Sequence, residues 1–93
     1  MGNTFFLSGN RLLEAINTNK DAAILFIYGV NDTFSLVQFG YKLEPKYCLP
    51  KALDDGNQLL LVVKKYLENN PSQLHESATI LVSLALREPF PCP

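Results

Sequence analysis

The positions of proline constrain the fold of this chain more than any other feature of its sequence. Proline inside a helix removes a backbone hydrogen bond and clashes with the preceding turn, so it marks where helices end. All six prolines lie between or beyond segments with a periodic apolar pattern: Pro45, Pro50, Pro71, Pro89, Pro91 and Pro93. One apolar run, residues 24–28, is also compatible with a buried strand, but the helical pattern around it continues too far for a strand. We therefore predict an all-α fold.

Two helices are predicted in the first half of the chain. The first begins at Ser8, a residue type that commonly caps helices, and ends at residues 17–19. The second runs from about residue 19 to residue 39, and its polar side chains form only a thin strip, so we expect most of its surface to be covered. Its inward face is expected to contain residues at helical spacing: Ala22, Phe26, Val30, Thr33 and Val37. Residues 40–51 are predicted to form an irregular connection.

Two further helices are predicted in the second half. The third begins at Asp54 or Asp55, because a carboxylate at that position favours the helix dipole, and it ends at residues 69–71. The fourth begins near Ser77. The two helices are similar in length and joined by a short connection, so we expect them to pack antiparallel. Since 93 residues support one hydrophobic core, residues 1–93 are predicted to form a single-domain bundle of about four helices.

Composition and charge exclude several classes of function. With 47% hydrophobic residues the chain is too apolar for intrinsic disorder. Its eight basic and nine acidic residues give no excess positive charge for nucleic acid, which we do not expect as a partner. The longest apolar stretch, residues 22–30, is about half of the roughly 20 residues that cross a bilayer, so no membrane association is expected either.

Cys48 and Cys92 are the two cysteines of the chain. With the one histidine, His75, they fall a ligand short of the usual zinc site, so no metal is expected. A disulfide is favoured over two free buried thiols because the core is small, and it implies an oxidising compartment. Antiparallel packing of the last two helices would bring Cys92 back to Cys48. The sequence shows no secretory leader, which fits either a cytosolic chain or a mature form that has lost its leader.

Residues for catalysis are sparse. Ser72, His75 and Glu76 lie close together in the sequence, but catalytic triads are normally assembled from separate elements. The glycines are isolated and form no phosphate-binding loop. We therefore expect no catalytic residue and no cofactor.

Apolar residues outside the expected core favour a binding function. Leu61 falls on the polar side of the third helix, and Ile80 and Leu84 fall on the second side of the fourth. Either the first two helices cover Ile80 and Leu84, or these residues form a subunit interface. Burial inside the protein is a weaker explanation for Leu61.

The second half of the chain also carries a set of motifs with distinctive order and spacing. They are CLP at residues 48–50, QL at 58–59, VVKKYL at 62–67, NP at 70–71, LH at 74–75, the apolar pattern of 78–88 and FPC at 90–92. In these motifs the chain resembles the Rap/Tai family of immunity proteins, which protect bacteria against peptidoglycan amidases delivered by the type VI secretion system. The departures are an extra residue near residues 56–57, Pro89, and the missing leader.

The resemblance implies an all-helical, often dimeric, periplasmic domain with a disulfide. It also implies that the protein is not an enzyme but blocks the active-site cleft of a cognate NlpC/P60-type cysteine amidase. In related immunity proteins a loop between late helices enters the cleft. Carried over to this chain, the contact residues are Asn69, Asn70, Ser72, Gln73, Leu74, His75 and Glu76. The outer face of the third helix is the next candidate surface: Leu61, Lys64, Lys65 and Glu68.

A periplasmic acid-stress chaperone, or another small helical binding protein, is the alternative function. Such chaperones depend on many titrating carboxylates, and nine acidic residues with one histidine make a modest switch.

Overall fold

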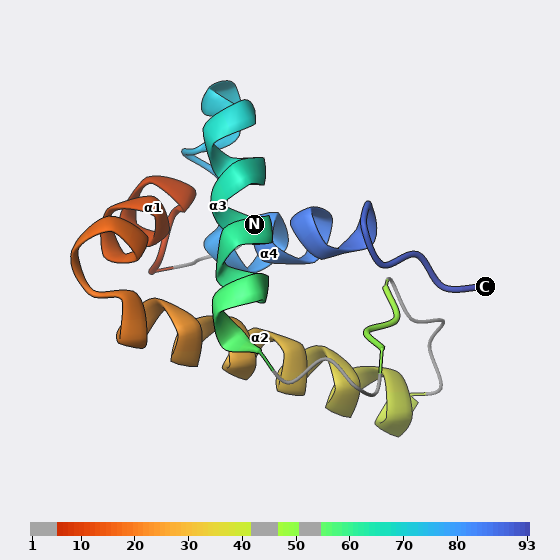
Figure 1. Ribbon diagram of the computed structural model, residues 1–93. Coiled ribbons are helices and arrows are strands. Elements are labelled where there is room, and N and C mark those ends of the chain that lie inside the picture. Colours follow the sequence, from red (N-terminus) through yellow and green to blue (C-terminus); the bar gives the residue numbers. More distant parts are fainter. Residues whose placement is uncertain (1–5, 42–46, 51–54) are drawn as a thin grey trace.

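The computed structural model describes residues 6–41, 47–50 and 55–93. These residues form helices α1 (Gly9–Thr18), α2 (Lys20–Tyr41), α3 (Gly56–Asn69) and α4 (Ala78–Arg87), with a short 3-10 helix, η1 (Pro71–Gln73), between the last two (Figure 1). The predicted all-α class with four helices is therefore confirmed. Residues 24–28, the run compatible with a strand, lie inside α2. Pro45 and Asp54 lie outside the described residues.

The caps predicted from the sequence fix the starts of α1 and α3. The Ser8 side chain accepts a hydrogen bond from the Arg11 N–H at 3.3 Å, and the Asp55 carboxylate accepts one from the Asn57 N–H at 3.0 Å. Each bond satisfies a backbone donor that the first turn of a helix leaves free. α1 ends at Asn19, whose side chain accepts from the Ala22 N–H at 3.4 Å. One residue thus closes α1 and supports the first turn of α2.

Of the residues expected on the inward face of α2, Val30 is buried and Phe26 and Val37 are half-buried, but the buried face as a whole is rotated from the expected one. Ala23, Ile27 and Val30 are its buried residues, whereas Ala22 and Thr33 are exposed. The physical reason is that α2 is apolar on nearly every side. The spacing of its apolar residues therefore does not indicate which face is buried, and packing against the other helices decides this.

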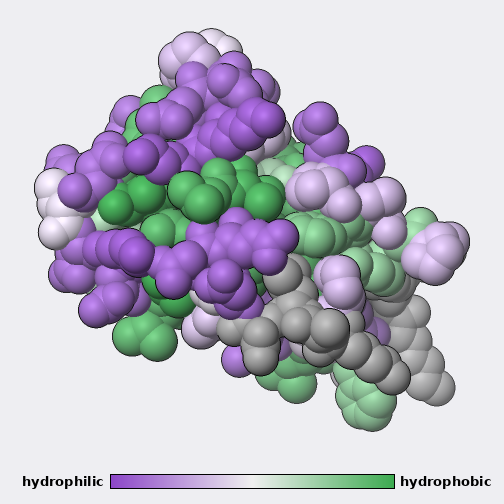
Figure 2. Space-filling view, in the orientation of Figure 1, coloured by the Kyte–Doolittle hydropathy of each residue, from purple (hydrophilic) through white to green (hydrophobic). Residues whose placement is uncertain are grey.

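The expectation that α2 is mostly covered is also wrong. Leu25, Leu36 and Phe39 are 69%, 70% and 89% exposed, and Figure 2 shows apolar side chains along the lower edge, where α2 runs. Among the described helices, α2 is the one long and apolar enough to cross a membrane, a test that core helices of soluble proteins and signal sequences also pass.

All four α-helices contribute to one core. α4 lies at its centre and has six buried positions among its ten residues. The fully buried large side chains come from every helix: Leu12, Ile27, Val63, Leu67, Leu81, Val82 and Leu86. α4 contacts α1 and α2 as well as α3, so it does not pack against α3 only.

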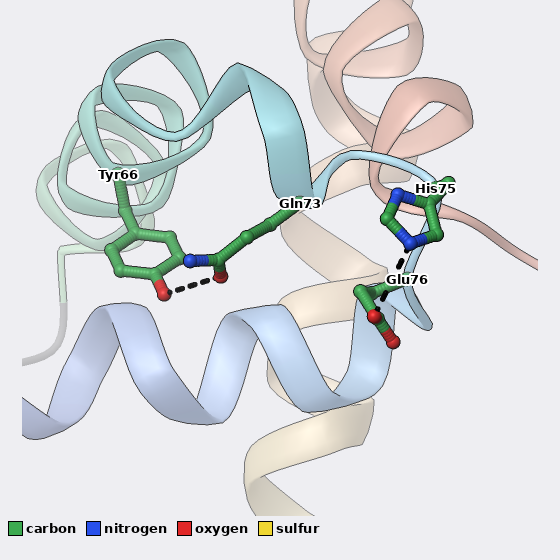
Figure 3. A network of polar contacts seen from close by, with 4 residues as sticks. All are labelled: Tyr66, Gln73, His75 and Glu76. Carbon is green, nitrogen blue, oxygen red and sulfur yellow. Dashed lines mark hydrogen bonds and ion pairs between the residues drawn. The ribbon is translucent and has the colours of Figure 1, made fainter.

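α3 and α4 cross instead of running antiparallel, as both Figure 1 and Figure 3 show. The predicted antiparallel hairpin is therefore wrong, and the reason is the central position of α4. The predicted disulfide between Cys48 and Cys92 is nevertheless confirmed, with their Cα atoms 4.9 Å apart. The Cys48 N–H donates to the Phe90 carbonyl at 2.8 Å. The disulfide thus joins the segment before α3 to the segment that follows α4.

Candidate partner-binding site

Residues 69–77 connect α3 to α4 and are held by hydrogen bonds at their start. Asn70 caps α3: its N–H donates to the Leu67 carbonyl at 3.3 Å, and its side chain donates to the Tyr66 carbonyl at 2.8 Å. Pro71 then begins η1, where its missing N–H costs nothing. The Tyr66 hydroxyl donates to Gln73 Oε1 at 3.1 Å (Figure 3). Two of the predicted contact residues, Asn70 and Gln73, therefore bond back to α3.

The other predicted contact residues divide into one that packs inward and four that face solvent. Leu74 is half-buried against the core. Asn69, Ser72, His75 and Glu76 are exposed. His75 Nε2 lies 3.3 Å from Glu76 Oε1 (Figure 3), with side-chain exposures of 75% and 51%. At that exposure the pair adds little to stability, so both groups remain accessible for a partner.

The far end of the loop is clamped by the start of α1. The Gly9 N–H donates to the Glu76 carbonyl and the Asn10 N–H to the Leu74 carbonyl, both at 2.9 Å, and the Ala78 N–H donates to the Leu7 carbonyl at 2.8 Å. Ser8 and Ser77, the caps of α1 and α4, form an isolated antiparallel bridge. These bonds satisfy N–H groups that helix starts leave free, and they fix the backbone of residues 74–78.

Gly9 permits this clamp. A Cβ atom at position 9 would collide with the Leu81 side chain and lie 3.1 Å from the Leu74 carbonyl oxygen. Sequence reasoning missed the role of α1 at the site. An isolated glycine after a cap residue carries no signal of the segment it will face, because that segment lies at the other end of the chain.

The three interface candidates are placed differently. Leu61 on α3 and Ile80 on α4 are 64% and 53% exposed. Leu84 is half-buried and packs against the core. Packing inside the protein therefore explains much of the burial of Leu84. Leu61 and Ile80 are exposed, so a role in a subunit interface stays a prediction for these two residues. The exposed face of α2, with Leu25, Leu36 and Phe39, is an additional apolar surface that the sequence pattern assigned to the interior.

An open groove of about 540 Å³ lies where α3 crosses α4. Val62, Tyr66 and Ala85 contribute to its lining together with the polar side chains of Lys65, Asn69, Asn70 and Glu88. Lys65 also belongs to the outer face of α3 and is exposed with Glu68, whereas Lys64 is half-buried. The groove adjoins the loop through Asn69 and Asn70.

Tyr47 anchors the segment that carries Cys48. Its hydroxyl donates to Asn31 Oδ1 at 3.0 Å, and its ring packs edge-to-face on Phe34 with centroids 6.4 Å apart. Burial, with a smaller contribution from the Asp32 charge, raises the pKa of Tyr47 to about 12. Its role is to fix residues 47–50 on α2.

The described residues contain no group of three or more His, Cys, Asp or Glu side chains that could hold a metal ion. The loop presents four exposed polar side chains, Asn69, Ser72, His75 and Glu76, on a backbone that is hydrogen-bonded at both ends.

Comparison with known proteins gives one match. The family model of the Rap1a immunity proteins matches residues 8–92, which include all four α-helices and both cysteines. No curated protein and no solved structure matches the chain.

Proposed function

Because the chain belongs to the family of Rap1a immunity proteins, we propose that it protects a bacterium by binding and inhibiting a peptidoglycan amidase delivered by type VI secretion. The loop of residues 69–77 enters the active-site cleft of the amidase and excludes its substrate. The protein acts by binding, not by catalysis.

The observation that carries this proposal is the fixed backbone of the loop beneath exposed polar side chains. The loop is bonded to α3 through Asn70 and Gln73 and to α1 through Leu74 and Glu76. A segment already ordered before binding loses little conformational entropy when it enters a cleft. Of the four exposed side chains of the loop, Ser72 and His75 are the two that we propose enter the cleft.

The disulfide supports a periplasmic location, where thiols are oxidised and peptidoglycan is within reach of an amidase. The exposed apolar side chains of Leu61, Ile80 and the exposed face of α2 support a homodimer, since large exposed apolar side chains are often covered by another chain.

The experiment measures inhibition of a purified type VI peptidoglycan amidase from the bacterium that encodes this chain, with hydrolysis of muropeptides as the readout. A double variant, Ser72→Arg with His75→Glu, changes only exposed side chains of the loop and is expected to weaken inhibition at least tenfold. Asn57→Glu with Gln58→Arg is the control, because these residues are also exposed but lie at the other end of α3. Full inhibition by the loop variant would move the contact elsewhere. If the unaltered protein does not inhibit the amidase, the proposed function is wrong.

A further inference from the structure

The first turn of α1 and the loop form one continuous surface. The Gly9 and Asn10 N–H groups bond to the carbonyls of Glu76 and Leu74 at 2.9 Å, so the two backbones lie side by side. Figure 3 shows His75 next to α1. Asn10 and Arg11 follow directly in the chain, and both are exposed. We name Asn10, Arg11, His75 and Glu76 the α1–loop platform. A partner whose cleft receives the loop brings the rim of that cleft to α1.

Arg11 is poorly placed for the stability of its own helix. It lies in the first turn of α1, where a positive charge opposes the helix dipole, and that turn contains no acidic residue. Among the residues that the structure describes, the one ion pair joins His75 to Glu76, so Arg11 takes part in none there. Within residues 6–41, 47–50 and 55–93, the Arg11 guanidinium therefore has no charged partner.

We propose that Arg11 extends the toxin-binding surface beyond the loop by pairing with a carboxylate on the rim of the amidase cleft. This inference rests on the proposed function. A guanidinium offers two parallel N–H donors that match the two oxygens of a carboxylate, which gives both strength and orientation. Arg11 carries the permanent positive charge of the platform, so an acidic side chain is the group that complements it.

The test compares two charge reversals of the same kind. Arg11→Glu is expected to weaken binding of the purified amidase at least tenfold by calorimetry. Lys20→Glu, at an exposed position beyond the opposite end of α1, is expected to leave binding unchanged. Arg11→Lys keeps the charge but not the paired donors, and an intermediate affinity is expected. The association rate of the unaltered protein should fall with added salt, and that of Arg11→Glu should fall less.

Thermal unfolding separates a lost contact from a damaged fold. Glutamate in the first turn of a helix is favourable, so Arg11→Glu should unfold at the same temperature as the unaltered protein or higher. Equal binding by Arg11→Glu and the unaltered protein would overturn the inference. If that result accompanies lost binding by the Ser72→Arg, His75→Glu variant, the proposed function stands without the Arg11 contact. If the unaltered protein itself does not bind the amidase, both fail.

Discussion

At Gly9 the fold depends on the absence of a side chain. A Cβ atom there would collide with Leu81 and press on the Leu74 backbone, whereas a Cβ atom at Gly29 would meet nothing within 4 Å. Gly29 lies exposed in the interior of α2, where glycine is less favourable than alanine. The two glycines therefore differ in what a methyl group would do.

Gly9→Ala is expected to lower the free energy of unfolding by about 1–3 kcal/mol, as overpacking commonly does. Gly29→Ala is expected to raise it by about 0.5–1 kcal/mol, because alanine restricts the unfolded chain and favours the helix. Urea denaturation measures both. Equal stability of Gly9→Ala and the unaltered protein would show that the clamp between α1 and the loop tolerates a side chain.

Tyr47 should make stability depend on pH in the alkaline range. Its pKa is about 12 in the folded protein and the ordinary value is 10.0. Between these values the unfolded chain loses a proton that the folded chain retains, so the free energy of unfolding falls as the pH rises from 10 to 12, by about 2 kcal/mol. Denaturation at a series of pH values measures this slope. Tyr47→Phe removes the titrating group and should show a smaller decline, while a slope equal to that of the unaltered protein would contradict the assignment.

At the scale of the helices, the sequence predicted where helices begin and end more accurately than it predicted how they pack. Ser8 and Asp55 identify the starts of α1 and α3 because a cap acts on the backbone within three residues. The face of α2 and the direction of α4 depend on other helices. α2 and α4 are apolar around most of their circumference. The spacing of apolar residues in these two helices therefore does not indicate how each helix is oriented in the core.

The same limit applies to the candidate site. The bounds of the loop could be read from Pro71 and Ser77, and its role as the contact segment, which the family resemblance implies, stays a prediction. The clamp from α1 could not be predicted, since it consists of backbone bonds that any residue with an N–H can form.

Exposed apolar residues on different helices predict an effect on oligomeric state. Leu61→Glu, Ile80→Glu and Leu36→Glu should each leave the helical circular dichroism unchanged, because these side chains are more than half exposed. If the proposed homodimer forms through one of these residues, the variant at that residue should elute as a monomer by size exclusion with light scattering. Leu84→Glu is the contrast: it should lower stability because the side chain packs against the core. If all three exposed variants elute like the unaltered protein, these residues do not form a dimer interface.

For the molecule as a whole, the disulfide is the principal long-range constraint. It joins residues separated by 44 positions in the sequence. In the chain-entropy description, a loop of that size stabilises the folded state by about 4 kcal/mol, which is a large part of the stability of a small domain.

Cys48→Ser with Cys92→Ser is therefore expected to lower the free energy of unfolding by roughly 3–4 kcal/mol. Urea denaturation of this variant should match that of the unaltered protein in excess reductant. If both the double variant and the reduced protein were as stable as the oxidised protein, Tyr47 and the hydrogen bond from Cys48 to Phe90 would hold residues 47–50 in place without the covalent link.

Cys92 follows all four helices in the chain, and its partner precedes α3. The covalent link cannot close until α3 and α4 have been synthesised and have left the ribosome, so the chain reaches its full stability late in its biogenesis. Newly made copies that have not yet met an oxidant would be less stable than the oxidised protein and therefore more exposed to proteases.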